Sequence, residues 1–163
     1  ASTHPYIMGL DQYLKGIKHL SVCEKCAIGE LQPELSAAAS DLLKDFKLTK
    51  DDIDFPYSII NVAFPAFYWR KANQIHAWFE SEVADNKFDN GGTYFVNKDT
   101  LSKLLHSIQE ALDSKDGTIL KPKSGFFWGS TEIDEWYWEE LKDTLRLRER
   151  LDKFDYFEYT ANW

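Results

Sequence analysis

The alternation of apolar and polar residues predicts four short strands. Residues 8–17 alternate in this way, which is typical of a strand with one buried face. Residues 57–62, after Pro56, and residues 93–96, after a turn-forming stretch, are rich in β-branched and aromatic side chains. Residues 154–159 form an aromatic segment of the same kind near the C-terminus. We therefore expect about four strands.

Between these strands, a second pattern with a period of about 3.6 residues predicts helices. The helix expected over residues 66–84 has the clearest apolar face. Asn97 is a suitable N-cap for the third helix, and Ser130 or Thr131 for the fourth. In that fourth segment, acidic residues near the start and arginines near the end also suit the helix macrodipole. The four expected helices cover residues 33–46, 66–84, 97–112 and 130–150.

The order of these elements predicts an α+β fold with a small, mainly antiparallel sheet of about four strands packed with three to four helices. Strands and helices do not alternate strictly, and no glycine-rich phosphate loop follows a strand, which disfavours a doubly wound nucleotide-binding fold. The chain of 163 residues suits a single domain, expected over residues 8–163. Residues 1–7 precede a Met8 that resembles a natural start, so we expect them to be a cloning remnant.

Composition narrows the classes of partner. The formal net charge of −8 arises from 27 acidic and 19 basic residues, which disfavours a protein that binds nucleic acid directly by neutralising many phosphates. An acidic face can instead bind a basic partner. No apolar run approaches the roughly 20 residues of a membrane span, and no signal sequence opens the chain. We therefore expect a cytoplasmic protein without membrane contact, in the host cytoplasm if it is encoded by a phage.

The best candidate site lies on the helix expected over residues 66–84. Spacings of four, three and four residues place Trp69, Asn73, His76 and Glu80 in one stripe. An imidazole can transfer protons near neutral pH, an amide can bind ligand oxygens, and an indole can stack on a base or sugar. In the alternative interpretation, Trp69 belongs to the core and His76 satisfies a neighbouring carbonyl group.

Further ligand-binding candidates flank this stripe. Two basic residues near the expected helix start could favour an anion, and the aromatic segment from Phe126 could line a pocket with the hydroxyl residues after it. On an ideal helix, Arg70 lies too far round from the apolar face to share one ligand with His76. The additional candidates are Arg70, Lys71, Phe127, Ser130 and Thr131.

Metal and cofactor chemistry are less well supported. His19, Cys23 and Cys26 form a His-x-x-x-Cys-x-x-Cys pattern, but tetrahedral zinc needs a fourth ligand, and plain loop cysteines explain the pattern more simply. His76 and Glu80 could serve a hydrolase or a metal site, although the His-Glu-x-x-His pattern is absent. We predict no cofactor and leave open whether the protein is an enzyme.

Three segments together resemble a family of small phage and prophage proteins whose activity is uncharacterised. They are residues 8–14 (MGLDQYL), 68–79 (YWRKANQIHAWF) and 124–135 (SGFFWGSTEIDE). The similarity covers most of the chain from Met8 but not residues 18–54. The resemblance implies a phage or mobile-element context, in which small proteins often counter host defence by binding a host protein or a nucleotide signal.

These observations leave three functional hypotheses. The first is a non-catalytic binding protein, with a role in counter-defence, that takes a small polar or anionic, nucleotide-like ligand between Trp69, Asn73, His76 and residues 126–131. The second is an acidic inhibitor that binds a host protein through Glu132, Asp134, Glu135 and Glu139. The third is a hydrolase or transferase that uses His76 with a nearby carboxylate. The sequence does not predict an oligomeric state.

Overall fold

The computed structural model describes residues 9–23 and 57–163. The chain divides into two compact units, one made of residues 1–17 and 63–163 and the other of residues 18–62. All the helices that are described lie in the first unit. The helix expected over residues 33–46 and the segment before Met8 lie outside the described residues.

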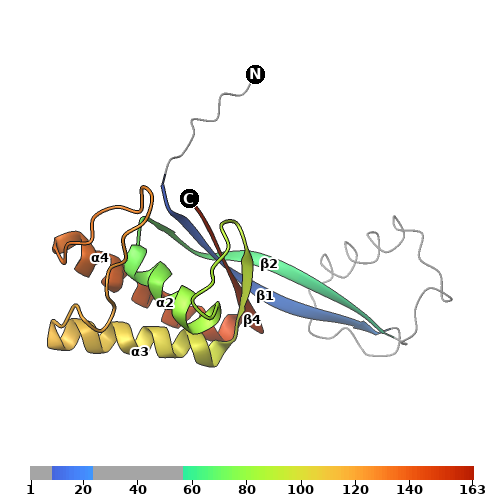
Figure 1. Ribbon diagram of the computed structural model, residues 1–163. Coiled ribbons are helices and arrows are strands. Elements are labelled where there is room, and N and C mark those ends of the chain that lie inside the picture. The colour runs from blue at the N-terminus through green and yellow to red at the C-terminus, as the bar shows by residue number, and fades with distance from the viewer. Residues whose placement is uncertain (1–8, 24–56) are drawn as a thin grey trace, which may run out of the picture. The chain divides into compact units, whose positions relative to one another are not determined.

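The sheet has four strands, the number expected from the sequence, and they lie in the order β2-β1-β4-β3 (Figure 1). The strands are β1 (Asp11–Cys23), β2 (Tyr57–Arg70), β3 (Thr93–Val96) and β4 (Tyr156–Asn162). Strand β4 pairs antiparallel with β1, where Tyr13 lies opposite Thr160, and with β3, where Phe95 lies opposite Glu158. The first two strands extend further along the chain than predicted, because β1 continues beyond Ile17 and β2 beyond Val62.

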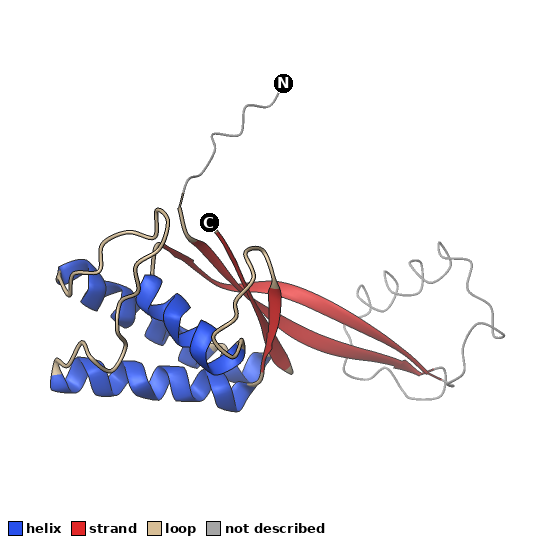
Figure 2. Cartoon of the chain, viewed as in Figure 1, coloured by secondary structure: helices blue, strands red, loops and turns tan. Residues whose placement is uncertain are grey.

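In the part of the chain that the structure describes, three α-helices pack on one face of this sheet, which confirms the α+β prediction (Figure 2). They are α2 (Asn73–Val83), α3 (Lys98–Ser114) and α4 (Glu135–Thr144). Two 3-10 turns, η2 (Leu145–Glu149) and η3 (Leu151–Lys153), then lead into β4.

The core lies between the helices and the sheet. Every second side chain of β4 is buried, namely Phe157, Tyr159 and Ala161, as the pleat of a strand with one covered face requires. The Phe79 ring of α2 stacks on the Tyr159 ring at a centroid distance of 3.9 Å. Burying one large apolar side chain contributes roughly 1.5–3 kcal/mol, so this helix–sheet contact stabilises the region around the candidate site.

Local signals in the sequence place α3 correctly. The Asn97 side chain accepts a hydrogen bond from the Thr100 backbone N–H at 2.7 Å, as an N-cap does. The buried stripe predicted for this helix includes Leu101, Leu104 and Ile108, and all three are fully buried.

The predicted start of the second helix is wrong. The sequence pattern places it near residue 66, whereas β2 continues to Arg70 and α2 begins at Asn73. Phe67 and Trp69 are buried while Tyr68 between them is half-exposed, which is the period of a strand. Three consecutive aromatic residues favour extended backbone, so Trp69 and Arg70 belong to the sheet.

The predicted extent of the last helix is also wrong. Ser130 and Thr131 do not cap it, because Asp134 is the N-cap and accepts from the Tyr137 N–H at 3.1 Å. Ser130 instead holds a local turn, in which its hydroxyl accepts from the Glu132 N–H at 3.0 Å. The α-helix ends at Thr144, and the arginines expected in its last turns lie in and after the 3-10 turn η2.

Candidate functional site

The first residue of α2 fixes the backbone of the loop between α3 and α4. Asn73 is buried, and its side-chain N–H₂ group donates to the carbonyl oxygens of Trp128 at 3.2 Å and Ser130 at 2.9 Å. Its side-chain oxygen accepts from the Lys123 N–H at 3.1 Å. A single buried amide thus pairs three backbone groups of this loop. Removing this amide would leave these polar groups without their hydrogen-bond partner.

Close packing inside the loop constrains it further. The Trp128 ring is buried against Gly125, where a Cβ atom would lie 2.1 Å from the indole, so no larger residue fits there. Phe127 between them adopts a left-handed backbone with φ of 58°. Such a conformation costs a bulky residue roughly 1–3 kcal/mol and persists only where the surroundings enforce it.

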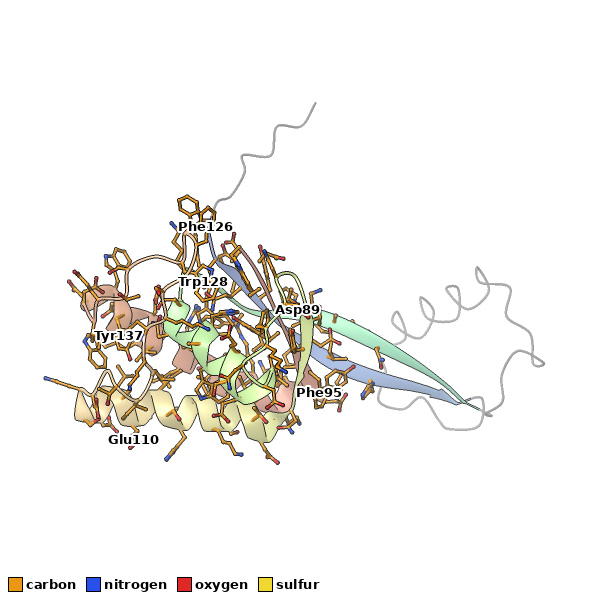
Figure 3. The ribbon with its side chains drawn as sticks, in the orientation of Figure 1. Asp89, Phe95, Glu110, Phe126, Trp128 and Tyr137 are labelled. Atoms are coloured by element: carbon orange, nitrogen blue, oxygen red, sulfur yellow. The ribbon has the colours of Figure 1, made fainter. Side chains whose placement is uncertain are left out.

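The same loop presents large apolar side chains to solvent. Phe126 is 72% exposed and Trp136, in the first turn of α4, is 77% exposed. In Figure 3, Phe126 points away from the body of the protein while Trp128 lies against it. Phe127 and Ile133 are close to half-exposed. We call these four residues, together with Glu132, Asp134, Glu135 and Glu139, the aromatic–acidic surface.

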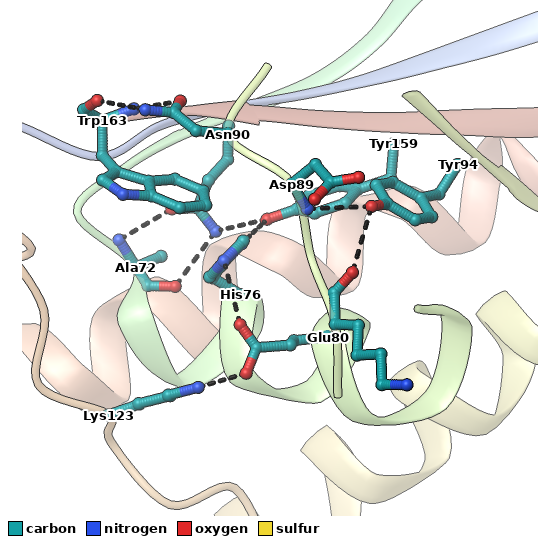
Figure 4. A network of polar contacts seen from close by, with 11 residues as sticks. Ala72, His76, Glu80, Asp89, Asn90, Tyr94, Lys123, Tyr159 and Trp163 are labelled. Carbon is teal, nitrogen blue, oxygen red and sulfur yellow. Dashed lines mark hydrogen bonds and ion pairs between the residues drawn. The ribbon is translucent and has the colours of Figure 1, made fainter. Parts of the chain in front are cut away.

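His76 lies at the centre of a buried polar network (Figure 4). Its side chain is fully buried, and its Nδ1 atom lies 2.8 Å from the Tyr159 hydroxyl oxygen. That hydroxyl accepts from Gln12 Nε2 at 3.1 Å, and the Gln12 amide is oriented by bonds to both the N–H and the carbonyl of Ala72. Burial raises the pKa of Tyr159, so its hydroxyl stays protonated.

The other side of the imidazole faces a charged pair. His76 Nε2 lies 3.8 Å from a Glu80 carboxylate oxygen, and Glu80 forms an ion pair with Lys123. Burial lowers the pKa of His76 from 6.5 to about 4; the Glu80 charge opposes this shift and the Lys123 charge reinforces it. His76 is consequently neutral at physiological pH. Among the described residues, His76 Nε2 and Trp128 Nε1 are buried without a hydrogen-bond partner.

The structure does not place Trp69 and His76 in an open pocket. Trp69 Nε1 donates to the Thr144 hydroxyl at 2.8 Å, and its ring packs at the edge of Phe79. His76 is bonded internally, to a tyrosine hydroxyl instead of the carbonyl considered in the alternative interpretation. Asn73, His76 and Glu80 do lie together on α2, but their polar groups contact other parts of the protein.

The remaining ligand candidates are dispersed. Arg70 is exposed and pairs with Asp11 at 3.4 Å. The Lys71 backbone N–H donates to the Leu10 carbonyl at 2.7 Å, which ties β1 to the start of α2. Phe127, Ser130 and Thr131 are exposed in the loop held by Asn73, and the Ser130 carbonyl oxygen accepts from Asn73.

The predicted metal motif falls partly outside the described residues. His19 and Cys23 lie in β1 and not in the loop expected from residue 18, whereas Cys26 is not described. His19 Nδ1 is hydrogen-bonded to the Asn61 side chain. Within residues 9–23 and 57–163, no group of three metal-ligating side chains is assembled.

No sequence pattern pointed to Glu140, a titratable residue of interest. Glu140 on α4 accepts a hydrogen bond from Gln74 Nε2 at 2.8 Å. Burial raises the pKa of its carboxyl group from 4.5 to about 7, despite the opposing effect of this bond. The 66 residues between the two partners explain why periodicity within one helix could not reveal the contact.

Comparison with known proteins gives no family, because no family model, no curated protein and no solved structure matches this chain. None of the described helices has the length and apolar character needed to cross a membrane. The functional argument therefore depends on the geometry of the site itself.

Proposed function

We propose that this chain is a binding protein that attaches to a basic partner protein through its aromatic–acidic surface. The observation that carries the proposal is the exposure of Phe126 and Trp136, each above 70%. Phe126 lies on the loop whose backbone Asn73 fixes, and Trp136 lies in the first turn of α4. Large apolar side chains exposed at a surface are characteristic of interaction sites, and the Phe126 and Phe127 rings contact each other at a centroid distance of 4.3 Å. Aromatic residues, tryptophan above all, also dominate the binding energy of protein interfaces.

Because the loop is rigid, its exposed apolar side chains are better explained as a binding surface than as side chains that are merely exposed. A flexible loop loses conformational entropy when it docks, whereas a fixed loop has lost it on folding. The three bonds made by Asn73 and the packing of Trp128 on Gly125 supply that fixation. The left-handed backbone at Phe127 is consistent with a loop conformation selected for its surface.

Charge indicates the chemistry of the partner. The aromatic–acidic surface contains four carboxylates, of which Glu139 forms an ion pair with Lys142 at 3.0 Å, and residues 124–141 contain no lysine or arginine. A partner with basic residues around an apolar pocket would complement it and would associate faster at low ionic strength.

The two other hypotheses are less well supported by the geometry. A small ligand between Trp69, Asn73 and His76 would have to replace hydrogen bonds that these side chains already make within the protein. A reaction that uses His76 would need the fully buried imidazole to become accessible to substrate.

The test compares capture of bacterial proteins by matched variants. We expect Trp136→Ala and Phe126→Ser to reduce capture of a specific partner at least tenfold, as hot-spot residues do. Phe95→Ala is the control, because Phe95 is an exposed aromatic residue on β3, outside the proposed surface. Glu132→Gln combined with Glu135→Gln should weaken capture and reduce its dependence on salt.

The captured protein is then purified, and its affinity for each variant is measured directly. Equal binding by the wild type and by the Trp136 and Phe126 variants would refute the proposal, as would a loss of the same size for Phe95→Ala. Circular dichroism of each variant excludes unfolding as the cause of any loss.

A further inference from the structure

A second candidate site lies at the edge of the sheet. A hollow of about 550 Å³ is lined by residues of β1 and β2 and by Arg150, which follows η2. Its volume falls within the range of roughly 300–1,000 Å³ that is typical of small-ligand sites. None of its lining residues belongs to the aromatic–acidic surface, so this site is independent of the function proposed above.

Aromatic rings form much of the wall. Tyr13, Phe64 and Tyr68 are each 40–50% exposed. The Tyr13 and Tyr68 rings lie 5.2 Å apart, and the Tyr68 hydroxyl donates to the Asp11 carboxylate at 2.5 Å. The hydrogen bond fixes the position of the Tyr68 ring while leaving part of its surface accessible. Such rings can stack on any nucleobase, because every base has a π-face.

The charged residues that line the hollow are basic. They are Lys15 and Arg150, although the net charge of the chain is −8 and Glu158 of β4 lies opposite Lys15 in the register with β1. Lys15 is exposed and forms no ion pair with another described residue. Arg150 donates one hydrogen bond to the Ala66 carbonyl, which leaves other N–H groups of its guanidinium for a ligand.

We propose that this hollow binds a free nucleoside monophosphate. The base stacks on the exposed part of the Tyr68 ring, which packs against Tyr13, and the phosphate lies near Lys15 and Arg150. A hollow with aromatic walls and two cationic side chains suits a planar ligand that carries an anionic group. A free nucleotide is favoured over a nucleic-acid strand because the hollow is small and the rest of the chain is acidic, which would repel a longer polyanion.

Isothermal titration calorimetry with AMP, GMP, CMP and UMP tests the proposal. We expect at least one to bind in the millimolar range or tighter, and adenosine and inorganic phosphate to bind at least tenfold more weakly. Lys15→Gln and Tyr68→Leu should each weaken nucleotide binding about threefold to tenfold. Tyr68→Phe keeps the ring and should retain most of the affinity. Lys87→Gln removes an exposed lysine outside the hollow and should have no effect.

Three results would overturn the proposal. The first is no heat of binding for any monophosphate at millimolar concentration. The second is the same loss of affinity for Lys87→Gln as for Lys15→Gln, which would indicate nonspecific attraction. The third is tighter binding, per nucleotide, of a single-stranded hexanucleotide, which would identify a strand as the ligand. Thermal unfolding of each variant shows whether the fold is retained.

Discussion

The buried imidazole of His76 makes the stability of the protein dependent on pH. Its pKa is lowered from 6.5 to about 4, mainly because burial disfavours the charged form. Between these two values the unfolded chain binds a proton that the folded protein does not. The free energy of unfolding that depends on His76 is therefore fully present above pH 6.5 and falls as the pH decreases towards 4.

The size of this effect follows from the two pKa values. A shift of 2.5 pKa units, from 6.5 to about 4, corresponds to about 3 kcal/mol when the whole window is crossed. Over the narrower interval from pH 7.5 to pH 5, the linkage relation gives a loss of about 2 kcal/mol. This is a large fraction of the roughly 5–15 kcal/mol that stabilises a typical domain.

The assay is urea unfolding of the wild type and of His76→Gln at several pH values. Glutamine does not titrate but can still bond to the Tyr159 hydroxyl. The difference between the two proteins cancels other groups, including Glu140, whose raised pKa acts in the opposite sense over part of the same window. We expect the stability advantage of the wild type to be about 2 kcal/mol larger at pH 7.5 than at pH 5.

A constant difference between the two unfolding curves across this range would refute the reasoning, because it would mean that His76 titrates alike in the folded and unfolded states. His106→Gln is the control, since that histidine is exposed on α3. An unchanged m-value would confirm that the substitutions leave the extent of unfolding the same.

Three further predictions concern other parts of the site. Asn73→Ala should destabilise the protein by about 2–4 kcal/mol in urea unfolding, since it leaves buried backbone groups of the loop unpaired, and unchanged stability would argue against the fixation. Gly125→Ala should cost about 1–3 kcal/mol, because its Cβ atom would overlap the Trp128 ring, and calorimetry would detect this. Glu140→Gln should raise the melting temperature more at pH 8 than at pH 5, because a carboxyl group whose pKa is raised to about 7 destabilises the fold as it ionises; an equal change at both pH values would contradict this.

Local sequence signals were sufficient to predict that four strands exist and where α3 begins. The cap formed by Asn97 and the leucine stripe after it act within a few residues, so the sequence contains the whole signal. The start of α2 was misplaced because Tyr68 fits both the helical spacing of Ala72 and Ile75 and the alternation of β2. Pairing with β1, a segment distant in sequence, favours the strand, and no local pattern records it.

The polar network could not be predicted for a similar reason. Gln12, His76 and Tyr159 are separated by tens of residues, and each has an ordinary environment in the sequence. The stripe on α2 did single out Asn73 and His76, but periodicity indicates only which face of a helix a residue occupies. Whether that face meets a ligand or another part of the chain depends on the tertiary packing.

The role of Asn73 links the buried stripe to the exposed loop. The sequence pattern predicts that both are walls of one pocket, whereas the structure joins them through the hydrogen bonds of one amide. Of the three consecutive aromatic residues in the loop, Trp128 is directed inwards and Phe126 outwards, and the left-handed backbone at Phe127 allows the chain to reverse between them. Since exposing Phe126 and Trp136 gives no folding advantage, the cost of holding the loop in this form is an argument for the binding role proposed above.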